Sequence, residues 1–99
     1  MKKHYEYSFS KIMGYSDTTQ QIVIDVADSM NSGDYEDLND CINDTIDNSL
    51  IYYKDQWDVL QDFCTPQDAD WDYAMDELYS LIYSAIYEEE IDEDEEDEE

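Results

Sequence analysis

The chain has 99 residues, of which 29 are acidic and only four are lysine, and its formal net charge at pH 7 is −25. This length predicts a single small domain, and 41% hydrophobic residues are enough to give it a core. The charge excludes binding to nucleic acid or to an anionic membrane and predicts a basic partner. Because like charges repel in the compact state, we expect dissolved cations to stabilise the fold by screening.

The charge is unevenly distributed. Residues 1–54 hold all four lysines and ten acids, a net charge of −6, whereas residues 55–99 hold nineteen acids and no base, a net charge of −19. Ordinary surfaces mix the two signs. The absence of any basic residue after Lys54 therefore suggests a role beyond solubility.

The remaining composition predicts a soluble cytoplasmic protein. Cys41 and Cys64 form no close motif, so we expect two free thiols in a reducing compartment. The chain starts without the apolar core of a signal peptide. No run approaches the roughly 18 apolar residues of a membrane span.

Residues 1–15 fit two structures. Tyr5, Tyr7 and Phe9 alternate as in a strand, whereas Tyr5, Phe9 and Ile12 recur as in a helix. Because no partner strand is evident elsewhere and a lone strand has nothing to pair with, a short helix is favoured.

The next segment has clear helix signals. Ser16 is a good N-cap, Ile22, Val26 and Met30 recur at intervals of four, and Gly33 ends the pattern. We expect a helix of three to four turns here.

The central stretch, residues 35–64, carries an apolar stripe with spacings of three and four, which is typical of a helix with one buried face. Asp34 is placed to cap this helix. A helix of about 30 residues is long for a small domain, so a break near residues 50–54 is favoured. The stripe consists of Tyr35, Leu38, Ile42, Ile46, Leu50, Tyr53, Trp57, Leu60 and Cys64.

The last helix follows a boundary at Thr65-Pro66, where Thr65 reads as an N-cap, unless Asp68 or Asp70 caps the helix instead. Its apolar face consists of Trp71, Met75, Leu78, Ile82 and Ala85 or Ile86. Residues 88–99 are almost entirely acidic and predict a disordered tail.

A second stripe on this helix, formed by Tyr79, Tyr83 and Tyr87, widens the apolar face beyond what one small core needs. It predicts a homodimer. The expected fold is therefore all-α, a bundle of three to four helices in residues 1–87 followed by the acidic tail 88–99.

Metal and catalytic sites are not expected. Asp68, Asp70 and Asp72 begin like a calcium loop, but Tyr73 stands where that loop needs glycine and Tyr79 where it needs glutamate. A single histidine cannot form a zinc cluster, and no glycine-rich phosphate loop is present. We therefore predict no enzyme activity, no metal and no cofactor.

Carboxylates repeat at helical spacing without the lysine and arginine that normally accompany them on solvent-exposed helices. Carboxylates four residues apart lie about 6 Å apart along a helix axis. One DNA strand carries a phosphate per about 3.4 Å of axis, so its successive phosphates are comparably close in space. The carboxylates are candidate phosphate surrogates in partner binding. These residues are Asp37, Asp40, Asp44, Asp47, Asp55, Asp58, Asp62, Asp72, Asp76 and Glu77.

Two groups of residues, one in the central region and one at the acidic end, point to a known family. They are Glu36-Asp37-Leu38-Asn39-Asp40, Ile42, Asp47-Asn48, Tyr52-Tyr53, Asp55 and Glu95-Glu96-Asp97-Glu98-Glu99. This pattern resembles the Ocr family of podophage anti-restriction proteins, which are small, helical, dimeric DNA mimics. The likeness covers about 25 central residues and the acidic end, and Ser49-Leu50-Ile51 replaces a segment with a proline. If a phage encodes the chain, the protein would act in the cytoplasm of the host cell.

The resemblance implies occupation of the DNA-binding groove of a type I restriction–modification enzyme, or of another defence complex such as a CRISPR effector. The basic groove would be the partner, with no direct nucleic-acid contact. Two other functions remain open. An acidic adaptor or chaperone for basic proteins would depend on residues 88–99, and a charge that serves only solubility would have no basic partner.

Overall fold

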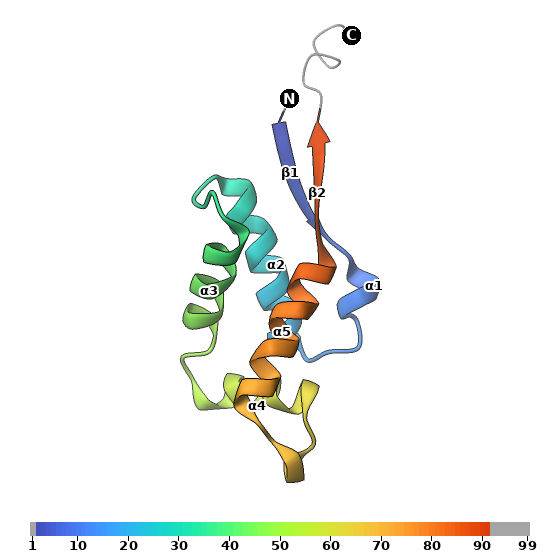
Figure 1. Cartoon of the computed structure of the whole chain (residues 1–99), viewed down its shortest axis with the longest axis vertical. Coiled ribbons are helices and arrows are strands. Elements are labelled where there is room, and N and C mark those ends of the chain that lie inside the picture. Colours follow the sequence, from blue (N-terminus) through green and yellow to red (C-terminus); the bar gives the residue numbers. More distant parts are fainter. Residues whose placement is uncertain (1, 92–99) are drawn as a thin grey trace, which may run out of the picture.

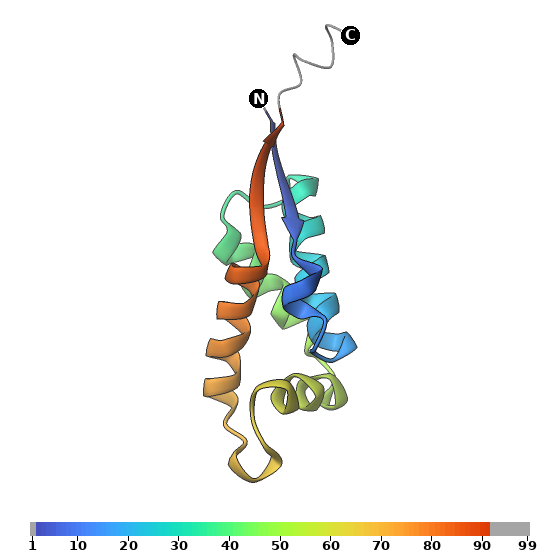
Figure 2. The same ribbon diagram turned by 90° about the vertical axis from the view of Figure 1, so that its right-hand side faces the viewer.

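A computed structural model describes residues 2–91 (Figures 1 and 2). It shows an elongated helical body with a two-stranded sheet that extends from one end. The prediction of a mainly helical fold is confirmed, but the fold is not purely all-α because two strands pair, and the described residues form five α-helices where three to four were expected. The elements are β1 (Lys2–Tyr7), α1 (Phe9–Ile12), α2 (Asp17–Ser32), α3 (Leu38–Ser49), α4 (Tyr53–Phe63), the 3-10 turn η1 (Pro66–Asp68), α5 (Trp71–Ala85) and β2 (Ile86–Ile91).

The sheet joins the two ends of the described chain. β1 and β2 are antiparallel, with Tyr7 opposite Ile86 and Tyr5 opposite Glu88. Tyr5 and Tyr7 are partly buried against the core, so this alternation was the strand signal. The free edge of β1 is covered by Asn31 of α2, whose side-chain oxygen accepts from the Tyr5 N–H at 2.7 Å and whose amide donates to the Tyr5 carbonyl at 2.8 Å.

Two predictions are corrected by this pairing. The short helix expected within residues 1–15 is limited to α1, because residues 2–7 have a partner strand after all. Residues 88–91, expected to begin a disordered tail, complete β2. The rest of that predicted tail, residues 92–99, lies outside the described residues.

α2 begins and ends where the sequence predicts. The Ser16 side chain accepts a hydrogen bond from the Thr19 N–H at 3.4 Å. Gly33 has φ 84°, a left-handed conformation that glycine adopts without strain, and its N–H donates to the Met30 carbonyl at 3.3 Å.

The predicted break in the central stretch is confirmed. α3 ends at Ser49 and α4 begins at Tyr53, although no proline is present. Leu50 is buried and anchors the connection, and the Gln56 side chain donates to the Leu50 carbonyl at 2.8 Å. The expected cap by Asp34 is wrong: Asp37 caps α3 by accepting from the Asn39 N–H at 2.9 Å.

The last helix, α5, is capped by Asp70, one of the two alternatives to Thr65. Thr65 and Pro66 start only the short turn η1, while the Asp70 carboxylate accepts from the N–H groups of Asp72 at 3.0 Å and Tyr73 at 3.3 Å. α5 then runs to Ala85 and continues directly into β2.

The core lies where α2 packs against α3, α4 and α5. Val26, Ile42, Val59, Leu78 and Ile82 are fully buried. The predicted stripe is followed in α3 but not in α4, where Val59 is the buried residue, because the break turns α4 onto a different face. Within residues 2–91 no helix combines the length and apolar character that crossing a membrane requires.

Candidate partner-binding surface

Three carboxylates of α3 and that of its N-cap residue, Asp37, form an exposed row. Asp37, Asp40, Asp44 and Asp47 are all exposed. At about 100° per residue, their spacings of three and four place them within about 80° of one another around the axis. We call these four residues the α3 acidic row.

The one described hydrogen bond to the carboxylates of Asp40, Asp44 and Asp47 comes from a neutral donor. Asp44 accepts a hydrogen bond from the Tyr35 hydroxyl at 3.0 Å. This bond is the main reason that the pKa of Tyr35 lies above its usual value, so the hydroxyl stays a neutral donor. Asp40 and Asp47 make no hydrogen bond or ion pair to any described side chain, which leaves both carboxylates free for a partner.

α5 adds further carboxylates near its start. Asp72 and Asp76 are exposed and lie four residues apart on one face. Glu77 lies on a different face and accepts from the Tyr73 hydroxyl at 3.0 Å. This bond is the first cause that raises the pKa of Tyr73.

Tyrosine–asparagine pairs hold α3 and α5 side by side (Figure 1). The Tyr79 hydroxyl donates to Asn43, and the Tyr83 hydroxyl donates to the Asn39 side-chain oxygen at 2.6 Å. Two residues of the predicted dimer stripe therefore contact α3 within the same chain. Tyr87 remains 47% exposed. The homodimer stays a prediction. The sequence did not predict these asparagine contacts, because the asparagine side chains carry no charge or apolar surface.

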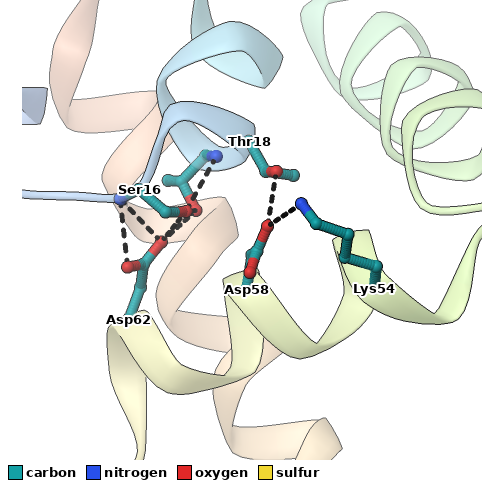
Figure 3. Close-up of polar contacts among 6 residues, drawn as sticks. Ser16, Thr18, Lys54, Asp58 and Asp62 are labelled. Carbon is teal, nitrogen blue, oxygen red and sulfur yellow. Dashed lines mark hydrogen bonds and ion pairs between the residues drawn. The ribbon is translucent and has the colours of Figure 1, made fainter.

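The carboxylates of α4 face the start of α2 (Figure 3). Asp62 accepts from the Ser16 N–H at 3.1 and 3.2 Å, from the Ser16 hydroxyl at 2.7 Å, and from the Thr19 hydroxyl. Asp58 accepts from the Thr18 hydroxyl at 3.1 Å and pairs with Lys54 at 3.5 Å. These two carboxylates fasten α4 to α2, although their sequence spacing is like that of the α3 acidic row.

Asp55 lies in the same direction. With Thr18 and Gln21 it lines a hollow of about 220 Å³ between α2 and α4. A second hollow of about 250 Å³, between α2 and α3, contains Asp25 and Asp28. The sequence interpretation missed these last two, whose spacing of three was the available signal.

Of the ten predicted residues, the α3 acidic row presents four outward and α5 presents two, while Glu77 lies on another face of α5 and is bonded to Tyr73. The α4 residues lie between the helices. Lys11 donates to the Ser84 carbonyl at 3.0 Å and Lys54 pairs with Asp58. Of the lysine side chains that the structure describes, neither is bonded to the α3 acidic row.

Metal binding has no geometric support in residues 2–91, where no three histidine, cysteine or acidic side chains cluster to hold an ion. Asp70 is engaged as the cap of α5. Cys41 is buried, and this burial raises the pKa of its thiol, which keeps it protonated.

No protein-family model, curated protein or solved structure matches the chain. The resemblance to the Ocr family therefore rests on the quoted residues alone.

Proposed function

We propose that the protein is a DNA mimic that inhibits a host defence complex by occupying its DNA-binding surface. The candidate targets are a type I restriction–modification enzyme and a CRISPR effector, and the mechanism involves no catalysis. The observation that carries the proposal is the α3 acidic row, which is exposed and is bonded to neither of the described lysine side chains. The resemblance to the Ocr family supports the same function.

The spacing of the row suits a phosphate-binding surface. From Asp37 to Asp47 the helix advances about 15 Å at 1.5 Å per residue, and four carboxylates lie within that length. One DNA strand places four to five phosphates in about 15 Å, at 3.4 Å each. Asp72 and Asp76 on the neighbouring α5 would supply a second group of negative charges.

Inhibition would follow from competition. A basic groove that releases counterions on binding DNA gains affinity in the same way from a rigid array of carboxylates. Phosphate contacts supply most of the affinity that does not depend on sequence, so base edges need not be imitated. Each carboxylate is solvated and contributes little alone, so the effect should be distributed over the row.

The hydrogen bonds of the α4 acids support a narrower choice of contact residues. Asp58 and Asp62 are bonded to α2, and Asp55 lies toward the same helix. We assign contact to the α3 acidic row with Asp72 and Asp76, and a stabilising role to Asp58 and Asp62.

Affinity capture from a host lysate tests the proposal. The full chain is immobilised, bound proteins are eluted either by duplex DNA or by a salt gradient, and the eluted proteins are identified. Release of one DNA-binding complex by duplex DNA is the expected result. Recovery of many unrelated basic proteins, all lost at modest salt, would contradict mimicry.

Truncation separates the mimic from an acidic adaptor. A chain ending at Tyr87 would lose most of β2, so the informative truncation is after Ile91. A mimic that acts through α3 and α5 should keep its inhibition when residues 92–99 are removed. An adaptor that depends on the acidic end should lose binding to basic proteins.

A further inference from the structure

α4 and the start of α5 lie at the end of the molecule opposite the sheet (Figure 1). An apolar groove lies between these two elements. Its volume is about 240 Å³, and both tryptophans of the chain line it. We call it the aromatic groove. Its lining residues are Tyr53, Gln56, Trp57, Leu60 and Trp71.

The aromatic groove is not covered by the fold. Tyr53 is 79% exposed and Trp71 is 40% exposed. Ile51 and Tyr52, which precede α4, are 65% and 73% exposed and extend the apolar surface along the chain. Single exposed apolar side chains are common, but a contiguous group of them marks an interaction surface.

The charge around the groove indicates which kind of partner could bind there. Asp68, Asp70 and Asp72 flank Trp71 in the sequence and are exposed, whereas Lys54, next to Tyr53, is the one base close in sequence to the lining residues. A second copy of this chain would bring two acidic surfaces together. Nucleic acid and anionic membranes would be repelled for the same reason.

We propose that the aromatic groove docks a positively charged protein segment that carries a bulky apolar side chain. The apolar side chain would enter between the two tryptophans, and lysine or arginine on either side would face the aspartates and the ring faces. Aromatic anchors within a charged rim are typical of protein–protein interfaces. This inference goes beyond the proposed function and does not depend on it.

The proposal is tested by measuring the affinity of the full chain for two labelled peptides. One is a short peptide of lysine and leucine, and the other has serine at every leucine position and the same charge. At physiological salt we expect the leucine peptide to bind about tenfold more tightly, since it buries apolar side chains. It should also shift the tryptophan emission to shorter wavelength, because both fluorophores line the groove.

Variants locate the binding site. Tyr53→Ala and Trp71→Ala should each lower the affinity for the leucine peptide about fivefold or more. Neither should change the affinity for the serine peptide. Tyr73→Ala is the matched control, because Tyr73 is 50% exposed on the same helix as Trp71 but does not line the groove. Circular dichroism checks that each variant keeps its helices.

Three results would overturn the proposal. The first is equal affinity of the two peptides for the native chain. The second is unchanged affinity in both groove variants while their helices are intact. The third is a dimer in sedimentation that Trp71→Ala dissociates, since a second copy would then be the occupant.

Discussion

Replacing Asp62 should destabilise this protein, even though removing a negative charge from a chain of net charge −25 would ordinarily stabilise it. Asp62 accepts hydrogen bonds from the Ser16 N–H, the Ser16 hydroxyl and the Thr19 hydroxyl. Thr19 is fully buried. In Asp62→Ala its hydroxyl would lose this acceptor without gaining water.

The magnitude follows from these bonds. A hydrogen bond to a charged group contributes about 1.5–3 kcal/mol, and an unsatisfied buried polar group costs about 1–3 kcal/mol. Because Asp62 is half-buried and relief of repulsion offsets part of the loss, we expect Asp62→Ala to lower the free energy of unfolding by about 2–4 kcal/mol. For a domain of this size that corresponds to a fall in Tm of roughly 10–25 °C.

Urea denaturation followed by circular dichroism, at fixed pH and salt, measures this loss. Asp47→Ala is the matched control, because Asp47 is exposed and makes no hydrogen bond to a described residue; its stability should change by less than about 0.5 kcal/mol. If Asp62→Ala proved as stable as Asp47→Ala, the bonds that fasten α4 to α2 would not stabilise the fold.

Three further predictions concern stability and reactivity. A thiol reagent should label the half-buried Cys64 first and Cys41 only on unfolding, because Cys41 is buried and burial raises the pKa of its thiol; simultaneous labelling in the native state would refute this. Burial also raises the pKa of Tyr79 above its usual value of 10.0, so the neutral hydroxyl contributes its full stability to the fold below pH 10, and this contribution is lost as the pH rises through the folded pKa. The free energy of unfolding of Tyr79→Phe should therefore fall less steeply with rising alkaline pH than that of the native chain. An equal slope in the two proteins would contradict this. Raising salt from 0.01 M to 0.15 M shortens the Debye length from about 30 Å to about 8 Å and should raise Tm in thermal scans, whereas a flat or falling Tm would disprove the role of self-repulsion.

Local signals in the sequence predicted local structure well. Ser16 and Gly33 mark the ends of α2, because a cap and a left-handed glycine depend only on neighbouring backbone groups. The break after Ser49 followed from helix length. These features need no knowledge of distant segments.

Contacts between distant segments could not be predicted from the sequence. β1 has a partner only because residues 86–91 return beside it, and the acidic side chains there hid a strand whose backbone does the pairing. The direction of a carboxylate row is likewise a tertiary property. Asp44 on α3 and Asp58 on α4 each belong to a row of acids with helical spacing. Asp44 is nevertheless exposed, while Asp58 accepts a hydrogen bond from Thr18 of α2.

The most direct test of DNA mimicry is displacement of a labelled DNA duplex from the captured target by charge-reversed chains. One variant carries Asp40→Lys, Asp44→Lys and Asp47→Lys in the α3 acidic row. The control carries the same change of net charge at scattered exposed positions, Asp17→Lys, Asp28→Lys and Glu89→Lys. The account predicts that the control displaces DNA far better than the row variant, both being folded. Equal displacement by the two would contradict it, because affinity would then follow net charge and not the surface of α3.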